Sequence, residues 1–552
     1  MKKIIVCLLI ICMVFASMPV SVVSAEATGP IKGEDYVQDD VTYTYLGECT
    51  LEEIFISVSD ESSWGYQGEG SYWLWNQKTQ TLTLHNAAAL GLSIVGAEFS
   101  GKPVTILLEE QAAILNDSVS LNTAIYCDGD LVITGEGTLS VLQVSTTDES
   151  IYSSTISCLD LIISGANITL ASLLNENGSI DANNINIING ANVTIASMSS
   201  YYTRFLYCDN LLIKDSTVKC SALCSIIDES NYCDGFEVNN NATIENSIVK
   251  MDMASEFTDV YGIYVYDGNL VINRGSAIIL NMQSIYSYGI SAPKIIIDNA
   301  YINSNGGVMT SWGSLGYIET SDEFIEYWII TPEISITNDV IITDGAALTY
   351  NDCENTYEFD DMVTIMSSDQ EAEEFTIAPR TYDDINANDW FASATGFVTA
   401  RGLFKGVSDT DFDPNGKFTR GQMMMLLARM AGADTTPPEG KPWYEGARLW
   451  AIEAGVSDGT NPEDYITREQ LVTMLWNFLG KPGEELGELG DIVLLFDDAD
   501  KIEPWAENAI SWAVLNQVVS GKGDNKFDPD GTATRAEASQ LMMNFFLNYI
   551  EI

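Results

Sequence analysis

Asp128-Gly129-Asp130-Leu131-Val132-Ile133-Thr134-Gly135 is the stretch that decides the fold of the N-terminal part, because versions of it recur along the chain. Each copy joins a run of β-branched residues, a short turn of Gly, Asn or Asp, and a second run in which polar and apolar residues alternate. This pattern predicts strand, bend and strand. The clearest further copies begin at Asp160, Ile187, Asn210, Asn241 and Asn269.

The turns of these copies recur roughly every 25 residues, which is the signature of a solenoid. One such unit cannot bury its apolar face alone, so the units must stack into a continuous core. We predict an all-β right-handed parallel β-helix of about ten coils over residues 81–345, its hand following from strand twist and crossover rules. The turn residues expected to take a positive φ are Asn86, Glu110, Gly135, Gly165, Gly190, Asp215, Asn246, Gly275, Asn299 and Asn338.

Stacked coils would align polar residues into ladders. The residues that precede equivalent strands are Asp130, Asp160, Asn210, Asn241 and Asn269, with Asn184 displaced by one position. One interpretation is a ladder of amide side chains that closes the turns. The alternative is Ca2+ binding, because carboxylates are the hard oxygen ligands that this ion prefers. The carboxylates for that site would be Asp128, Asp130, Asp160, Asp209 and Asp267.

The charge of the chain narrows its partners. Its formal net charge is -54, from 79 acidic and 25 basic residues. Such a chain repels polyanions, so we expect neither nucleic acid nor an anionic lipid surface as a partner. Divalent cations, sugars and cationic surfaces remain as candidate partners.

The N-terminus predicts export. Residues 1–25 combine two lysines, an apolar run and the small-residue ending Val23-Ser24-Ala25, which is the form of a cleavable signal peptide. A retained N-terminal anchor is the alternative. No later apolar run is long enough to span a bilayer, so we expect no membrane association after signal cleavage.

Two segments flank the predicted β-helix. Residues 26–80 are acidic and aromatic, and we expect them to cap the open first coil. An alternative for their aromatic residues is a platform that stacks on sugars. Its members would be Trp64, Tyr66, Tyr72, Trp73 and Trp75. Residues 346–380 lose the periodicity and gain acids, which predicts an acidic linker or a C-terminal cap.

No catalytic constellation emerges from the residues. A β-helix lyase needs a base and further cations around its substrate, whereas Lys and Arg are scattered over the predicted coils. Two carboxylates suffice for a glycosidase, but with this many acids chance pairs are unavoidable. We therefore expect a protein without enzymatic activity, and a polysaccharide-degrading enzyme is the alternative.

The C-terminal part changes to helical periodicity and contains three related units, residues 381–432, 441–482 and 494–548. Each unit predicts a helix, a Gly-rich loop and a second helix capped by Thr419, Thr467 or Thr534. Three such hairpins predict an all-α bundle with pseudo-threefold symmetry. An arginine follows each capping threonine, where the helix dipole disfavours a cation. This favours an anionic ligand, and a salt bridge to a neighbouring acid is the alternative.

These units resemble S-layer homology (SLH) domains. The first carries Tyr382-Asp-Asp384 and Phe418-Thr-Arg420, and the third carries Phe496-Asp-Asp498 and Ala533-Thr-Arg535-Ala-Glu537. The resemblance implies non-covalent attachment of a secreted protein to pyruvylated secondary cell-wall polysaccharide, in the cell wall or S-layer of a Gram-positive-type bacterium. It also implies the residues that bind this polymer: Arg420, Arg468 and Arg535 on its carboxylate, with Asp384, Asp498, Trp390, Trp443 and Trp505 shaping the grooves.

The units also depart from the family pattern. The first has Gly421-Gln422 and the second has Glu469-Gln470 where the family has Ala-Glu, and the second lacks the opening aromatic-x-Asp. One or two grooves are therefore expected to be silent.

The repeats of the N-terminal part are similar to β-helical carbohydrate-binding domains of clostridial surface proteins, some of which bind pectin with Ca2+. The likeness rests on Trp75–Leu84 and on the copies at Ile125 and Ile263. It implies a wall-anchored adhesin or carbohydrate-binding protein, with acidic plant or host polysaccharide as a candidate ligand. A wall-anchored pectin-degrading enzyme and a passive S-layer component are the alternatives.

Overall fold

The structure is a computed structural model of the 552-residue chain. It describes residues 35–38, 41–48, 53–68, 70–116, 123–144, 153–173, 177–199, 203–224, 233–255, 260–273, 275–283, 287–298, 300–304, 307–309, 315–319, 324–328, 333–337, 340–342, 346–351, 362–367, 370–371, 375–379, 382–386, 389–482 and 496–549. The predicted signal peptide lies outside these ranges. The chain divides into two compact units, one of residues 1–337 and 344–376, the other of 338–343 and 377–552.

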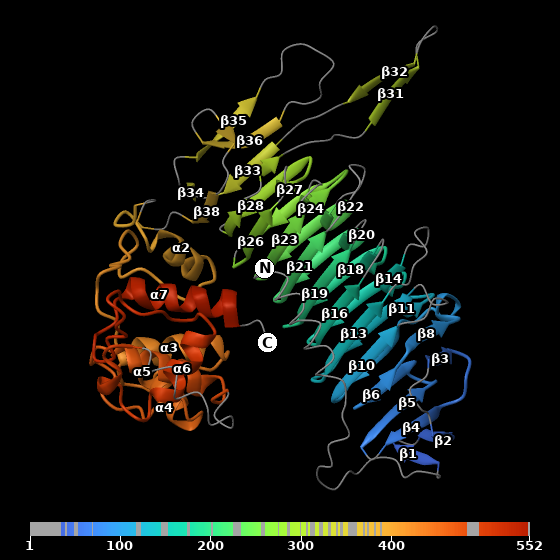
Figure 1. The fold of residues 1–552 in the computed structure, drawn as a ribbon, viewed down its shortest axis with the longest axis horizontal. Helices are drawn as coiled ribbons and strands as arrows, with labels where there is room; N and C mark the ends of the chain where they lie inside the picture. The colour runs from blue at the N-terminus through green and yellow to red at the C-terminus, as the bar shows by residue number, and fades with distance from the viewer. Residues whose placement is uncertain are drawn as a thin grey trace. The chain divides into compact units, whose positions relative to one another are not determined.

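The first unit is a β-solenoid, whose strands stack in parallel rows (Figure 1). One row contains β7 (Ala88–Ala89), β10 (Gln111–Asn116), β13 (Thr138–Val144), β16 (Asn167–Leu173), β19 (Asn192–Ser199), β21 (Thr217–Cys224), β23 (Ile248–Ser255), β26 (Ala277–Gln283) and β29 (Tyr301–Ser304). These are the second, alternating runs of the sequence copies, paired in parallel from one coil to the next.

The first runs of the copies form a second parallel row. It contains β6 (Thr81–His85), β9 (Val104–Leu108), β12 (Leu131–Thr134), β15 (Asp160–Ser164), β18 (Asn184–Ile188), β20 (Thr203–Lys214), β22 (Cys233–Glu245), β25 (Asn269–Ile272), β28 (Lys294–Asp298) and β33 (Glu333–Thr337). The predicted β-solenoid is thereby confirmed, while its coil count and its hand stay predictions.

A third row completes the coils. It contains β3 (Glu53–Ser57), β8 (Gly91–Val95), β11 (Thr123–Cys127), β14 (Ser153–Ser157), β17 (Asn177–Asp181), the first halves of β20 and β22, β24 (Val260–Val265), β27 (Ser287–Ser291) and β30 (Gly307–Met309). Strand β3 falls inside the range predicted as a cap, so that range already contains a solenoid strand.

The core of the solenoid is an aliphatic stack. Equivalent positions of the second row place one isoleucine above another, each fully buried: Ile106, Ile133, Ile163, Ile187, Ile213, Ile244 and Ile272. Because side chains alternate across a strand, the residues between them face outward. This is why the first run of each copy is rich in β-branched residues.

Most of the predicted turn residues adopt the expected conformation. Positive φ angles are found at Asn86, Gly135, Gly165, Gly190, Asp215, Asn246 and Gly275. Glu110 does not take a positive φ, which corrects that prediction. Its Cβ makes a left-handed backbone costly, whereas Gly or Asn tolerates it. Asn299 and Asn338 lie outside the described residues.

Side-chain amides link successive coils. Asn184 Nδ2 donates to Asp160 Oδ1 at 2.7 Å, and Asn210 Nδ2 donates to Asn184 Oδ1 at 2.9 Å. Asn184 pairs in register with both neighbours, so its predicted displacement by one residue is wrong. These hydrogen bonds confirm the ladder interpretation for Asp160, Asn184 and Asn210.

The N-terminal end carries antiparallel strands. Here β1 (Tyr36–Gln38) pairs with β2 (Val41–Glu48), and β4 (Ser63–Gly68) pairs with β5 (Ser71–Asn76), which pairs with β6. A cluster of Tyr43, Trp64 and Leu74 forms the core of this region. The short 3-10 helix η1 (Ala97–Phe99) lies between β8 and β9.

The C-terminal end of this unit also carries antiparallel pairs. They join β31 (Leu315–Glu319) to β32 (Phe324–Trp328), β35 (Ala346–Asn351) to β36 (Met362–Ser367), and β36 to β37 (Gln370–Glu371). A further antiparallel pair joins β34 (Val340–Ile342) to β38 (Phe375–Pro379), and its paired residues belong to the second unit. Strands therefore occupy part of the range predicted as an acidic linker or C-terminal cap.

Beyond the β34–β38 pair, the described part of the second unit is helical. Its elements are α2 (Ala392–Ala400), α3 (Arg420–Met430), α4 (Glu445–Glu453), α5 (Arg468–Phe478), the 3-10 helix η4 (Ala499–Lys501), α6 (Glu507–Leu515), α7 (Arg535–Asn544) and η5 (Phe545–Tyr549). Thr419, Thr467 and Thr534 cap α3, α5 and α7, and each closes a full capping box with the residue three positions on. Among the described residues, no helix is long and apolar enough to cross a membrane.

The three helical repeats contact one another in a cycle. Helix α3 packs against α4 of the second repeat, α5 against α6 of the third, and α7 against α2 of the first. The backbone closes the same cycle just before the capping threonines. Phe418 N donates to Ala533 O at 2.9 Å, Ala533 N to Ile466 O at 3.0 Å, and Ile466 N to Phe418 O at 2.9 Å.

Candidate functional site

Each capped helix of the second unit begins with an arginine that reaches the loop of the next repeat. Arg535 Nε donates to Phe412 O at 2.7 Å, and its Nη2 donates to Lys405 O at 2.7 Å. Arg468 Nε donates to Phe527 O at 2.9 Å, and its Nη2 donates to Ser520 O at 3.0 Å. We name each such contact between repeats a junction, after its arginine.

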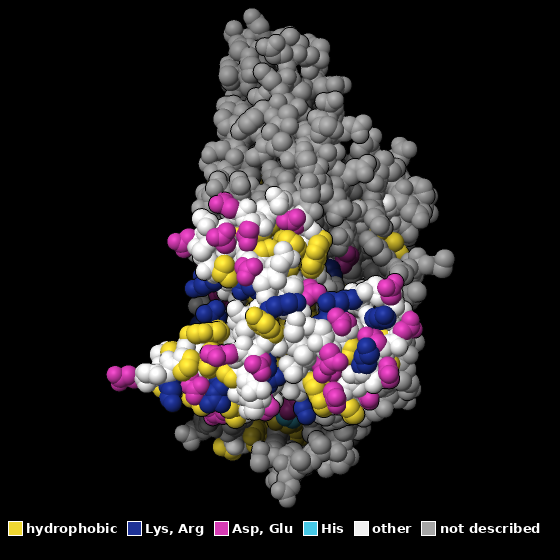
Figure 2. Space-filling view, turned by 90° about the vertical axis from the view of Figure 1, so that its left-hand side faces the viewer, with side chains coloured by type: hydrophobic (Ala, Val, Ile, Leu, Met, Phe, Trp, Pro, Cys, Tyr) yellow, Lys and Arg dark blue, Asp and Glu magenta, His cyan; other side chains and the backbone are white. Residues whose placement is uncertain are grey.

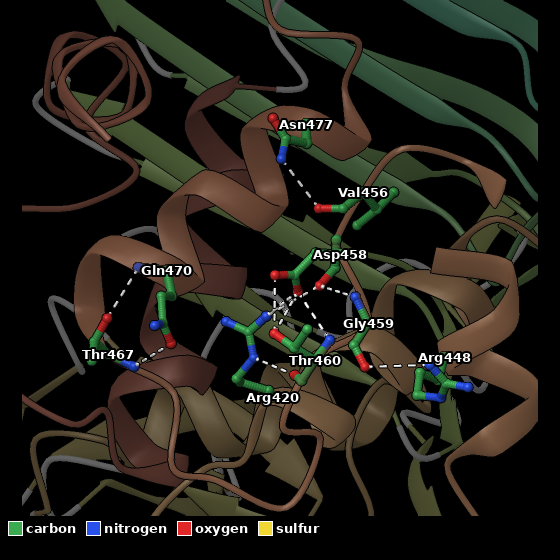
Figure 3. Close-up of polar contacts among 10 residues, drawn as sticks. Arg420, Arg448, Val456, Asp458, Gly459, Thr460, Thr467, Gln470 and Asn477 are labelled. Atoms are coloured by element: carbon green, nitrogen blue, oxygen red, sulfur yellow. Dashed lines mark hydrogen bonds and ion pairs between the residues drawn. The ribbon is translucent and has the colours of Figure 1, made fainter. Parts of the chain in front are cut away.

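The Arg420 junction has a different partner. Arg420 Nε donates to Thr460 O at 2.9 Å, in the same way as the other two arginines. Its Nη2, however, donates to the Asp458 carboxylate at 2.8 Å, as Figure 3 shows. The alternative interpretation of the arginines, a salt bridge to a neighbouring acid, therefore holds for Arg420.

The arginines are more buried than the predicted ligand-binding role implies. Arg468 is 9% exposed and Arg535 is 6% exposed, and burial lowers the pKa of both guanidinium groups. A buried guanidinium must find acceptors, and here backbone carbonyls supply them. The predicted role of these arginines on the polymer's carboxylate stays a prediction. Their Nη1 groups make no hydrogen bond with any residue in the described part of the chain.

Asp384 and Asp498 hold the loops that receive these arginines. The two Asp384 oxygens accept from the backbone N–H groups of Phe412 and Asp413 at 2.8 and 2.7 Å. The Asp498 oxygens accept from those of Phe527 and Asp528 at 2.8 and 2.9 Å. Each aspartate therefore fixes the loop whose carbonyl binds Arg535 or Arg468, and its part in a polymer-binding groove stays a prediction.

We expect Asp498→Ala to lower the free energy of unfolding of the helical unit by about 3 kcal/mol, because two buried amide groups lose a charged acceptor. Burial alone would raise the pKa of Asp498, but the N–H groups of Phe527 and Asp528 bring it below its ordinary value. Stability from this group is therefore present above the unfolded-state pKa and is lost as pH falls through the folded pKa. Urea unfolding followed by helical circular dichroism measures it.

The matched control is Asp500→Ala, because Asp500 is an exposed acid in the neighbouring 3-10 helix. It should change stability by less than about 0.5 kcal/mol. Equal effects of the two substitutions would contradict the role given to Asp498.

The three predicted tryptophans lie on the surface of the helical unit. Trp390 is 63% exposed, Trp443 52% and Trp505 49%. Exposed indoles offer flat apolar faces on which sugar rings stack. Figure 2 shows one face of this unit, where basic, acidic and hydrophobic side chains are interspersed.

A cavity of about 150 Å³ lies at the Arg468 junction. Trp390, Arg468, Gly521 and Glu537 are among its lining residues, so the structure brings a predicted tryptophan and a predicted arginine together. Lys522 Nζ lies 3.1 Å from Glu537 Oε1 beside it. A guanidinium edge next to an exposed indole suits a sugar that carries a carboxylate.

The predicted sugar-stacking platform of the N-terminal region is not formed. Trp64 and Trp75 are fully buried and Trp73 is nearly so, while Tyr66 and Tyr72 are partly buried. These rings pack inward because they supply the apolar core of the antiparallel end. Tyr72 stacks on His85 at 4.6 Å, and burial with the nearby Glu109 raises the pKa of Tyr72 to about 12.

Three of the acids predicted for Ca2+, namely Asp128, Asp160 and Asp209, accept hydrogen bonds from neighbouring residues. Asp128 caps η1 by accepting from Gly96 N at 2.6 Å and Ala97 N at 2.8 Å, and Asp209 accepts from Asn239 Nδ2 at 2.8 Å. Asp130 and Asp160 occupy equivalent positions of neighbouring coils, and Asp267 belongs to a turn further along. Within the described ranges, no three His, Cys, Asp or Glu residues gather as a metal would require. The structure does not assemble these five carboxylates into one site.

Sequence reasoning missed a polar cluster on the third row of the solenoid. Arg204 is one of the basic residues that the sequence shows scattered over the coils. It pairs with Glu237 at 2.9 Å and lies 4.0 Å from the centre of the Tyr207 ring. Tyr266 donates to the same Glu237 at 2.9 Å. Burial raises the pKa of Asp181, Arg204 opposes this, and Glu237 adds to it.

The register of the coils is the signal that could have found this cluster. Asp181, Tyr207, Glu237 and Tyr264 occupy one equivalent position of successive coils. Each recognised copy of the repeat begins with its second-row strand. The third-row strand precedes that copy, so the equivalence of these four positions was not visible in the repeat. Tyr264 contacts Tyr261 and Tyr266 edge to face, which extends the cluster into an aromatic surface.

The helical unit is thus a cyclic arrangement of three repeats with arginine-centred junctions. Residues 381–424 and 495–539, in the first and third repeats, match the family described as S-layer homology domain. The middle repeat shares their capping box and their arginine contact to the next loop. The chain therefore combines a β-solenoid with S-layer homology domains, which indicates a protein anchored at the cell surface.

Curated relatives match this chain in part. An amylopullulanase of Thermoanaerobacterium thermosulfurigenes is 30% identical over 177 residues, which is 30% of this chain and 9% of the relative. The exoglucanase XynX of Acetivibrio thermocellus is 28% identical over 176 residues, 29% of this chain and 16% of the relative. Cell surface glycoprotein 1 of the same species is 28% identical over 162 residues, 26% of this chain and 7% of the relative. The chain thus spans less than a fifth of each relative, in the S-layer homology region.

Proposed function

We propose that this chain is a secreted surface protein, held non-covalently on pyruvylated secondary cell-wall polysaccharide by its S-layer homology repeats. The observation that carries the proposal is the Arg468 junction. There a buried guanidinium and an exposed indole line one cavity, and a pyruvate ketal would present a carboxylate on a sugar ring to both groups. The cyclic backbone bonds support a bundle of pseudo-threefold symmetry, in which equivalent junctions repeat around one axis.

We expect the full chain to sediment with isolated bacterial cell walls and to stay in solution when the secondary polysaccharide has first been extracted by hydrofluoric acid. Peptidoglycan survives this treatment, so the comparison isolates the polymer as the partner. Walls whose pyruvate ketals have been removed by mild acid test the carboxylate. Equal sedimentation with intact and extracted walls would contradict the proposal.

We further propose that the solenoid displays a polysaccharide-binding surface without cleaving its ligand. The aromatic surface of Tyr207, Tyr261, Tyr264 and Tyr266 supports this, because tyrosine rings offer apolar faces and polar hydroxyl groups to a sugar chain. Glu237 is occupied by Arg204 and Tyr266, which favours a binding role over a nucleophilic one.

A second candidate is a wall-anchored polysaccharide-degrading enzyme. It is favoured by Asp181, whose pKa is raised by burial and by the nearby Glu237, because a glycosidase uses a pair of carboxyl groups, one of which acts as the acid. Retardation of the full chain on an immobilised acidic polysaccharide, with and without Ca2+, tests binding. Release of reducing ends or unsaturated uronides from the same polymer would decide for the enzyme, and an Asp181→Asn variant should then abolish that release.

A further inference from the structure

The loops that receive the three arginines differ at one equivalent position. Each loop starts at a residue with positive φ, Gly402, Gly455 or Gln517, and ends at another, Asp413, Asn461 or Asp528. The residue three positions after each start is Lys405, Asp458 or Ser520. The middle loop is shorter than the other two, so Thr460 stands where they have Phe412 and Phe527.

This position decides what the arginine meets. At the Arg535 and Arg468 junctions, Nη2 donates to the backbone carbonyl of Lys405 or Ser520. At the Arg420 junction, it donates to the side-chain carboxylate of Asp458 instead. The guanidinium that would receive a carboxylate from the polymer already holds one from its own chain.

The Asp458 carboxylate is fixed in place. It accepts from Thr460 N at 3.0 Å, and Thr460 Oγ1 lies 2.9 Å from each of its oxygens (Figure 3). The Thr460 amide and hydroxyl and the Arg420 guanidinium lower the pKa of Asp458, so it stays ionised at neutral pH. The Arg420 side chain is 12% exposed, whereas the Asp458 side chain is 64% exposed and stands at the rim.

An ion pair with one partner this exposed contributes little to the stability of the fold. The Asp458 carboxylate is more effective as a competitor of the polymer's carboxylate for Arg420. A group tethered to the same chain acts at a local concentration of about millimolar or above. Thr460 already holds the Asp458 side chain in place, so binding to Arg420 costs this side chain little further conformational entropy. Its charge also repels an approaching anion.

We infer that Asp458 acts as a built-in ligand that silences the Arg420 junction, so that an acidic wall polymer occupies only the Arg468 and Arg535 junctions. This inference rests on the proposed function and assigns the expected silent groove. A neutral residue at position 458 should open a third site.

The test is the number of pyruvylated fragments of purified secondary cell-wall polysaccharide that bind per full chain, measured by isothermal titration calorimetry. We expect about two for the natural chain and about three for Asp458→Ser, which copies Ser520. Asp458→Asn can keep the Thr460 contacts without the charge and should also give about three. Adding Arg420→Ala to Asp458→Ser should return the number to about two.

The matched control is Asp434→Ser, because Asp434 is an exposed acid that accepts from Thr436 N at 2.9 Å and makes no contact with an arginine among the described residues. It should leave the number unchanged. Three sites in the natural chain, or two in both Asp458 variants with unaltered circular dichroism, would overturn the inference. No binding by any variant would instead reject the proposed partner.

Discussion

Replacing Arg468 and Arg535 together with alanine should reduce binding of the full chain to isolated cell walls by about 100-fold or more. Each change removes a charged fork whose hydrogen bonds go to backbone carbonyls and not to a carboxylate. A charge-assisted contact of this kind contributes roughly 1.5–3 kcal/mol, and the two act on one polymer. The measurement is the wall concentration at half-maximal sedimentation.

The same arginines also link neighbouring repeats, so the fold must be measured beside binding. Helical circular dichroism and its thermal transition serve this purpose, and single variants keep most of the cyclic contacts. Arg429→Ala is the matched control, because Arg429 is an exposed cation in the last turn of α3. Unchanged sedimentation of the double variant would contradict the assignment of these arginines to the polymer.

Phe236→Ala should destabilise the solenoid by about 3–5 kcal/mol, because a large ring is removed from a core that cannot fully collapse around the cavity. Phe236 is 0% exposed in β22, between two neighbouring coils. Hydrogen exchange of peptides from β20, β22 and β24 should accelerate by about 100-fold or more.

The control for this change is Phe99→Ala, since Phe99 lies in η1 and is 85% exposed. It should alter exchange in the same peptides by less than threefold, which corresponds to about 0.65 kcal/mol. Comparable acceleration by both variants would show that the solenoid core is not organised around Phe236.

Features that depend on neighbouring residues in the chain were predicted from the sequence, whereas features that depend on long-range contacts were not. The strands of the second row and the capped helices were predicted because β-branched runs, turn glycines and threonine caps act within a few residues. The prediction of a positive φ at Glu110 was wrong, because a turn position alone does not show whether the backbone is left-handed. The predicted sugar-stacking platform of N-terminal tryptophans was wrong, because composition does not reveal whether a ring faces the core or the solvent.

The sequence by itself determined the repeat, the solenoid class, the capped arginines and the S-layer homology likeness, because each is written in short motifs at regular spacing. Only the tertiary structure decided what those arginines meet. Arg420 finds Asp458, whereas Arg468 and Arg535 find backbone carbonyls, and Arg204 finds Glu237 on a neighbouring coil. These partners lie far apart in the chain, so only the packing of repeat against repeat and coil upon coil brings their charges together.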